Sequence, residues 1–168
     1  MESKHKTRAA NINLRPATAA DAECIARCVD AAYRHYIQRI GKPPGPMLDD
    51  YAQVVRRHHV FVAEVDRDSS GMLAGVLVLM QTVNGMLLDN LAVHPEHQRR
   101  GLGRRLLRLA ESETRALGRA HLELYSHERM TESIDFYRRA GYVETARRRE
   151  RGYHRVYMRK RLAYICAG

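Results

Sequence analysis

The sequence predicts an α/β fold in which a mixed sheet of about seven strands carries helices on both faces. Residues 60–93 contain three successive strand-like segments joined by short turns, which is typical of antiparallel strands. The last of these segments leads through a glycine-containing turn into an amphipathic helix at 102–117. A further strand follows that helix, so it is expected to lie parallel to the strand before the helix.

The first part of the chain predicts one strand and two helices. Residues 11–15 alternate between polar and apolar side chains, which indicates a short strand. Thr18 is a suitable N-cap for a helix that runs to about Tyr36. Residues 41–46 hold three prolines and two glycines, which cannot continue that helix. A second helix is expected at about 47–57.

The rest of the chain completes the order β-α-α-β-β-β-α-β-α-β-β. Asn84-Gly85 is the strongest turn signal, and Gly118 is expected to end the helix at 102–117. The other predicted elements are strands at 60–65, 72–83, 87–93, 121–125, 143–149 and 154–160, and a helix at 131–140.

Length and composition predict a single domain. At 168 residues the chain can bury close to two thirds of its unfolded surface, and 45% hydrophobic content is ordinary for a globular protein. Residues 1–10 are polar and basic and are expected to be disordered, so the domain is placed at 11–168. No apolar run approaches about 20 residues, and the N-terminus lacks a signal-peptide core. These features predict no membrane association and a cytoplasmic location.

A net charge of +10 is typical of a protein that binds nucleic acid, and also of one whose ligand is polyanionic. The densest basic run, residues 99–108, lies at the start of the helix after the third strand. A second cluster at 147–155 is expected to be the solvated face of a hairpin. No nucleic-acid recognition motif accompanies the charge, so no nucleic-acid partner is expected.

Cysteines and histidines do not predict a metal. Cys24 and Cys28 lie on one face of a helix and Cys166 near the end, so buried or idle thiols are expected. The nine histidines are scattered without the spacing of a metal site.

Residues 87–107 predict a phosphate site. The N–H groups at a helix start have no intrahelical partner and attract anions. Gly101 and Gly103 would let an anion approach the backbone, and arginines surround them. The dinucleotide fingerprint does not fit, because residue 106 is leucine where a third glycine would be needed.

The pattern of a strand, x-V-H-P-x-x-Q-x-x-G-x-G and a helix resembles the pyrophosphate-binding motif of the GCN5-related N-acetyltransferases (GNAT). The predicted order of elements is also that of the GNAT fold. The resemblance implies acetyl-CoA as co-substrate, with its pyrophosphate held by loop amides. It also implies that the strand before the loop splays from its neighbour and binds the pantetheine arm. The coenzyme A-binding residues expected on this basis are Leu91, Ala92, Val93, Gln98, Arg99, Arg100, Gly101, Leu102, Gly103, Arg104 and Ser133.

Residues 136–142 resemble the F-Y-x-x-x-G-[FY] segment of the same family. There the tyrosine protonates the leaving thiolate as general acid, a role that falls on Tyr137. A phenol with a pKa near 10 is protonated at neutral pH and so is able to donate. The alternative is a core tyrosine that covers the helix end. The family's common asparagine seven residues earlier is replaced by Met130, which could line the acyl pocket or serve in packing.

Asp89 is the predicted general base. Strand alternation places Asp89 on one face with Leu91 and Val93, and Asn90 on the other. A carboxylate inside an apolar strand is costly to bury without a purpose. The alternative is a structural carboxylate bonded to a neighbouring strand or cation. His127 and Glu64 are weaker candidates for the base.

In the family, the acceptor pocket is formed by the first two helices, their loop and the last hairpin. Asp49 and Asp50 could attract a cationic amine, or could be ordinary first-turn acids of the second helix. The residues expected at this pocket are Tyr33, Tyr36, Pro46, Asp49, Asp50, Tyr51 and Tyr153.

The resemblance therefore implies an N-acetyltransferase that moves the acetyl group of acetyl-CoA directly to a primary amine of a small molecule, peptide or protein. The alternative is a non-catalytic acyl-CoA-binding sensor, and a third hypothesis is a nucleic-acid binder supported by the charge alone. A homodimer is compatible with the sequence. The motifs do not specify the acceptor.

Overall fold

The computed structural model describes residues 11–65 and 71–163. The predicted disorder of residues 1–10, most of the turn at 66–71 and Cys166 lie outside the described residues.

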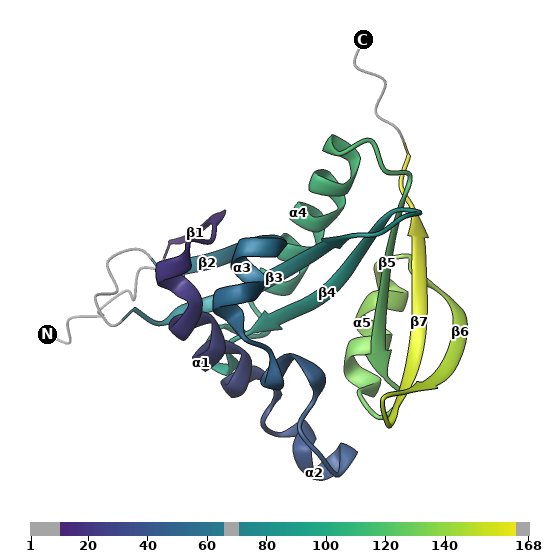
Figure 1. Cartoon of the computed structure of the whole chain (residues 1–168), viewed down its shortest axis with the longest axis horizontal. Helices are drawn as coiled ribbons and strands as arrows, with labels where there is room; N and C mark the ends of the chain where they lie inside the picture. The colour runs from purple at the N-terminus through teal and green to yellow at the C-terminus, as the bar shows by residue number, and fades with distance from the viewer. Residues whose placement is uncertain (1–10, 66–70, 164–168) are drawn as a thin grey trace, which may run out of the picture.

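Seven strands form one mixed sheet in the order β1-β2-β3-β4-β5-β7-β6. Every neighbouring pair is antiparallel except β4 and β5, which are parallel. The predicted α/β fold and the parallel strand after the helix are thereby confirmed (Figure 1). The strands are β1 (Ile12–Pro16), β2 (His59–Val65), β3 (Leu73–Gln81), β4 (Met86–Val93), β5 (His121–His127), β6 (Val143–Glu150) and β7 (Tyr153–Arg161).

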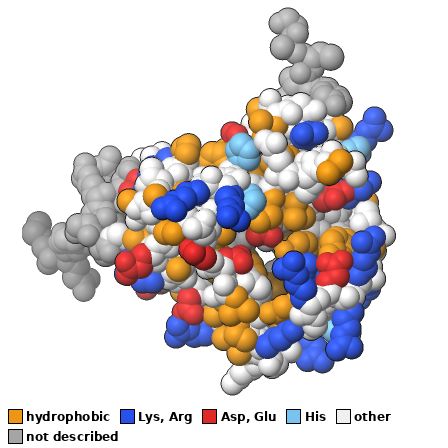
Figure 2. Space-filling model, viewed as in Figure 1, with side chains coloured by type: hydrophobic (Ala, Val, Ile, Leu, Met, Phe, Trp, Pro, Cys, Tyr) orange, Lys and Arg blue, Asp and Glu red, His pale blue; other side chains and the backbone are white. Residues whose placement is uncertain are grey.

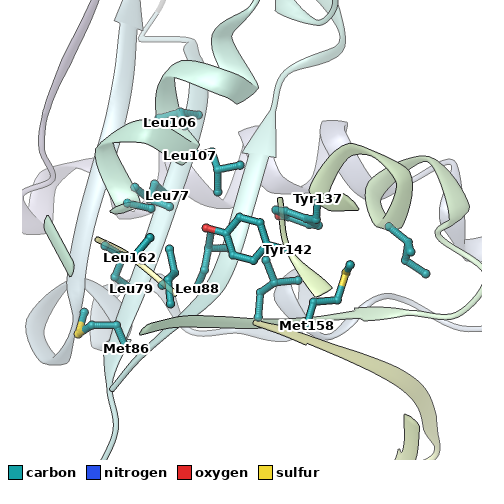
Figure 3. Close-up of a cluster of buried hydrophobic side chains, with 14 of the residues drawn as sticks. Leu77, Leu79, Met86, Leu88, Leu106, Leu107, Tyr137, Tyr142, Met158 and Leu162 are labelled. Carbon is teal, nitrogen blue, oxygen red and sulfur yellow. The ribbon is translucent and has the colours of Figure 1, made fainter. Parts of the chain in front are cut away.

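Helices cover both faces of this sheet (Figure 1). On one face lie α1 (Ala22–Tyr33) and α3 (Tyr51–Arg57), with the short α2 (Tyr36–Ile40) beyond α1. On the other face lie α4 (Leu102–Ala116) and α5 (Thr131–Arg139). The α4–α5 core combines leucines of α4 and the strands with Tyr137 and Tyr142 (Figure 3). The α1–α3 core is smaller and includes Cys28, which is a buried free thiol.

The first two helices differ from their predicted bounds. The helix expected to run to Tyr36 ends at Tyr33, and α2 then begins at Tyr36. The helix expected from residue 47 begins at Tyr51, after a 3₁₀ turn at Gly45–Leu48. Asp50 sets this start, because its carboxylate accepts hydrogen bonds from the backbone N–H groups of Ala52 and Gln53.

A β-bulge in β4 overturns the predicted facing of Asp89. Val78 of β3 pairs with Asn90, but Leu79 pairs with Leu88, so Asp89 is an extra residue without a partner on β3. A bulge shifts the side-chain alternation by one residue. Asp89 therefore shares the α1–α3 side with Asn90, whereas Leu91 and Val93 pack against the α4–α5 core. The prediction that Asp89 shares a face with Leu91 and Val93, opposite Asn90, is wrong.

Strands β4 and β5 are paired over only part of their length. Their ladder joins Met86, Leu87 and Leu88 to residues 122–124 and then ends. Beyond it the two strands diverge (Figure 1), so residues 91–93 have no β5 partner, as the resemblance implied. In this segment the Leu91 carbonyl accepts a hydrogen bond from the Tyr33 hydroxyl, and the Val93 carbonyl accepts one from Gln98 Nε2, both at 3.0 Å.

Candidate active site at the split between two strands

The loop between β4 and α4 presents backbone N–H groups at the start of a fifteen-residue helix. Gly101 is the N-cap of α4 and has φ +79°, a left-handed conformation that favours glycine. Gln98 ties the loop to the end of β4, because its Nε2 donates to the Val93 carbonyl at 3.0 Å. This geometry suits a phosphate group, as the sequence predicted.

A pocket of about 600 Å³ extends from this loop along the free edge of β4 to α5. It brings together most of the predicted coenzyme A-binding residues. Arg100 is exposed and does not line the pocket, and the Leu102 side chain is buried in the α4–α5 core. The predicted residues that do line the pocket are Leu91, Ala92, Val93, Gln98, Arg99, Gly101, Gly103, Arg104, Ser133, Tyr137, Tyr33 and Tyr36.

Tyr137 lies in the wall of this pocket, with its ring buried between Phe136 and Tyr142. Its hydroxyl makes no hydrogen bond to the described part of the chain, although the ring is only 7% exposed. Burial raises the pKa of the phenol above its ordinary value. Tyr137 is therefore protonated at neutral pH and has a proton available to a group in the pocket.

A second pocket, of about 750 Å³, opens on the α1–α3 side of the sheet. It corresponds to the hollow near the centre of Figure 2, which hydrophobic, acidic and basic side chains border. Six of its lining residues were named from the sequence for acceptor or base roles. They are Tyr33, Pro46, Asp49, Asp89, His127 and Tyr153.

Three predicted acceptor residues, Tyr36, Asp50 and Tyr51, lie outside this pocket. Asp50 caps α3, and Tyr51 is buried with its hydroxyl donating to the Pro46 carbonyl at 2.7 Å. Asn90 donates to the Tyr51 hydroxyl, and Tyr33 donates to the Asn90 side-chain oxygen at 2.8 Å. Tyr51 thus belongs to a buried network that fixes α1 and α3 on the bulged part of β4.

Tyr36 and Glu64 also lie away from the pocket for which the sequence named them. Tyr36 lines the first pocket rather than the second. Glu64 lies on β2 and is bonded to Arg15, away from both pockets.

Asp89 lies in the second pocket as a partly buried carboxylate. The Tyr125 hydroxyl donates to its Oδ1 at 3.0 Å. Burial raises the pKa of Asp89, against the opposing effects of Tyr125, His58 and Arg155. A carboxylate with a raised pKa is a stronger base than an exposed one, so the environment suits proton acceptance.

Sequence reasoning named His127 and Tyr153 but missed most of the other residues that the strands contribute to the second pocket. Alternation along the strand would have grouped Tyr125 with His127, but only the pairing of β5 with β4 and β7 brings Tyr125 to Asp89. In the first pocket it missed Phe136 and Arg139 of α5. The missed residues of the second pocket include Met80, Leu87, Glu123, Tyr125, Glu150, Arg151, Arg155 and Tyr157.

The family model for the acetyltransferase (GNAT) domain matches residues 56–144, just over half of the chain. The match includes β4 and residues 94–103, which we call the phosphate loop after their predicted role. The chain belongs to the GNAT acetyltransferase family. Among curated proteins, none matches it.

Solved structures support the same fold. A GNAT-family acetyltransferase from Desulfovibrio desulfuricans has a TM-score of 0.72 at 22% identity, over 91% of this chain and 100% of that one. The PaiA N-acetyltransferase of Thermoplasma acidophilum, in complex with coenzyme A, has a TM-score of 0.72 at 18% identity, over 90% and 99%. Nourseothricin acetyltransferase has a TM-score of 0.68 at 25% identity, over 90% and 99%.

The described residues of this GNAT domain contain no group of three or more side chains suited to a metal ion. Within the same residues, no helix is both long and apolar enough to cross a membrane.

Proposed function

We propose that this GNAT domain transfers the acetyl group of acetyl-CoA directly to a primary amine. The observation that carries the proposal is that the two pockets meet at the β4–β5 split, where Tyr33 lines both. One pocket contains the phosphate loop and a tyrosine with an uncommitted hydroxyl, and the other contains the carboxylate of Asp89. The separate placement of a proton donor and an acceptor suits a reaction that needs both.

Coenzyme A fits the first pocket by the chemistry of its wall. The N-terminal amides of α4, with Arg99 and Arg104, supply donors and positive charge for a pyrophosphate. The free edge of β4 at residues 91–93 supplies backbone groups for the amides of a pantetheine arm. Bound acetyl-CoA would supply the activated thioester. In the Thermoplasma relative of the same fold, coenzyme A is present in the crystal.

The chemistry assigned to the chain is proton transfer and positioning. Asp89 accepts a proton from the ammonium form of the acceptor, directly or through water, so that the amine nitrogen is able to attack the acyl carbon. The nitrogen–carbon bond forms, the carbon–sulfur bond breaks, and Tyr137 donates its proton to the departing thiolate. The excess proton on the acylated nitrogen then passes through water to the Tyr137 phenolate, and the proton on Asp89 is released to solvent. The remaining catalysis comes from holding the two reactants in contact.

The second pocket favours an acceptor with cationic character. Asp49 lies at the mouth of this pocket and makes no ion pair with the described residues, whereas Glu123 and Glu150 are bonded to Arg159 and Arg155. Burial and the nearby charge of Asp89 raise the pKa of Asp49, so an ammonium group placed between them would relieve repulsion. A small amine or the amino end of a peptide would satisfy these groups.

A steady-state screen tests the proposal. Thiol release from acetyl-CoA is measured with diamines, aminoglycosides and peptide N-termini as acceptors, and coenzyme A binding is measured separately by calorimetry. Coenzyme A binding with acetylation of at least one amine is expected. Binding without transfer to any amine would instead favour the acyl-CoA sensor, and absence of binding would refute both.

A further inference from the structure

Asp89 and Tyr125 occupy a special place in the sheet. The β4–β5 ladder pairs residue 86 with 122, 87 with 123 and 88 with 124, and it ends there. Asp89 and Tyr125 are the next two residues in that register. In place of backbone pairing, the Tyr125 hydroxyl donates to Asp89 Oδ1 at 3.0 Å. This side-chain bridge therefore stands at the vertex of the split, in the wall of the second pocket.

The partner strands hold Tyr125 firmly. Tyr125 pairs with Tyr157 of β7, and their ring centroids are 5.7 Å apart. The guanidinium of Arg155 lies over the Tyr125 ring, 4.0 Å from its centroid, and donates to Glu150 at 3.0 Å. Tyr157 donates to the same Glu150 oxygen at 2.6 Å. A cation over a phenol ring polarises the hydroxyl toward donation, so Arg155 reinforces the bond from Tyr125 to Asp89.

We propose that Tyr125 is a positioning residue for the general base: its hydroxyl fixes Oδ1 of Asp89, so that Oδ2 is the oxygen that takes the proton from the acceptor amine. The assignment rests on the proposed function, because it presumes that Asp89 is the base. Asp89 sits on a bulge, where the backbone alone constrains it less than in a regular ladder. The bond from Tyr125 supplies the missing constraint from the opposite strand.

The hydrogen bond from Tyr125 affects the pKa of the Asp89 carboxyl group. A hydrogen bond donated to a carboxylate favours the ionised form, so its loss raises the pKa of Asp89. Tyr125→Phe keeps the ring under Arg155 and removes only that donor. Base-dependent transfer should therefore fall at neutral and lower pH and recover as pH rises. The other groups that interact electrostatically with this carboxylate are His58, Asp49, Arg155, Tyr33 and Tyr51, and Tyr125→Phe leaves each of them in place.

The test separates this assignment from the proposed function. The Asp89 carboxyl carbon is followed by NMR in protein labelled with ¹³C-aspartate, and its resonance is identified by its loss in Asp89→Asn. No acceptor is needed for this titration. Tyr125→Phe should raise the Asp89 midpoint, whereas Tyr142→Phe, which removes a hydroxyl bonded to Glu111 outside both pockets, should not.

With an acceptor from the screen, Tyr125→Phe should lower kcat/KM at pH 6 by about tenfold, the size of one hydrogen bond to a charged group. The loss should shrink at high pH. An equal loss at every pH, or an unchanged Asp89 midpoint, would overturn the assignment even if acetyl transfer is confirmed.

A measurement on the unaltered protein covers the case in which Tyr125→Phe does not fold. The Tyr125 ζ-carbon should shift with pH at the same midpoint as the Asp89 carboxyl, because its hydroxyl senses the charge of its acceptor. A Tyr125 resonance that ignores the Asp89 titration would also overturn the proposal.

Discussion

Two adjacent buried tyrosines give opposite predictions for the loss of a hydroxyl group. Tyr137 and Tyr142 lie with ring centroids 5.8 Å apart in the α4–α5 core (Figure 3). The Tyr142 hydroxyl donates to buried Glu111 at 3.2 Å, whereas that of Tyr137 has no partner in the described chain and lies at the first pocket. Replacing each by phenylalanine removes one oxygen and keeps the ring.

The structure sets the expected magnitudes. Tyr142→Phe removes a hydrogen bond to a charged group and should cost about 1.5–3 kcal/mol of unfolding free energy. For a chain of this size that corresponds to a Tm lower by about 3–12 °C, with transfer unchanged. Tyr137→Phe breaks no bond within the described protein, so stability should change by less than about 0.5 kcal/mol. As the general acid it should lower kcat by about 10²–10⁴-fold.

The assays are thermal unfolding, coenzyme A binding by calorimetry, and steady-state thiol release for the wild type and both variants. Coenzyme A affinity should be the same in all three proteins, because neither hydroxyl is assigned to its binding. Wild-type kcat in Tyr137→Phe would refute the general-acid assignment and favour a packing role. A large loss of stability in Tyr137→Phe would show that its hydroxyl has a structural partner.

Three further predictions follow from the same geometry. Burial raises the pKa of Asp89, so its negative charge destabilises the folded protein at a pH above that pKa. Asp89→Asn should therefore raise Tm at pH 7 and lower kcat by about 100-fold or more. A lower Tm for the variant would contradict the predicted cost of the buried charge. Asp49→Asn should raise KM by about 1.4- to fivefold for dicationic acceptors, the range of one exposed ion pair, and leave it unchanged for monoamines. Equal KM changes for both kinds of acceptor would show that Asp49 does not select charge. A methyl group at Gly103 would contact Phe136 and Val93 at no less than 3.7 Å, so Gly103→Ala should fold normally. Because the methyl group enters the pocket, the variant should bind coenzyme A about tenfold more weakly in calorimetry, a loss of about 1.4 kcal/mol. Unchanged affinity would show that the phosphate loop does not need a glycine at this position.

Much of the fold was predictable because its signals are local. Period-two runs predicted all seven strands to within a few residues, and apolar spacing with Gly118 predicted α4. The break between α1 and α2 was missed, because residues 33–36 carry no glycine or proline. The start of α3 at Tyr51 was also missed, since Asp49 and Asp50 are equally good caps by sequence.

In the candidate site, too, the part formed by neighbouring residues was predictable, whereas the part formed by distant segments was not. The phosphate loop is contiguous, so its glycines, Gln98 and arginines could be recognised from their spacing, and residue 137 from a second short motif. The second pocket could not be assembled this way. Its walls come from α1, the loop before α3, β4, β5 and the last hairpin, and Tyr125 reaches Asp89 only through the pairing of three strands.

By itself, the sequence determined the order of elements and the glycine-containing turn at the start of α4, because hydrophobic periodicity and glycine at a helix start act over a few residues. The tertiary structure decided which side of the sheet Asp89 faces. The register of β3 against β4 leaves Asp89 as an extra residue with no partner on β3. The resulting bulge turns its carboxylate to the α1–α3 side of the sheet. Register depends on packing between distant segments, so a rule of simple alternation along one strand put Asp89 on the wrong face.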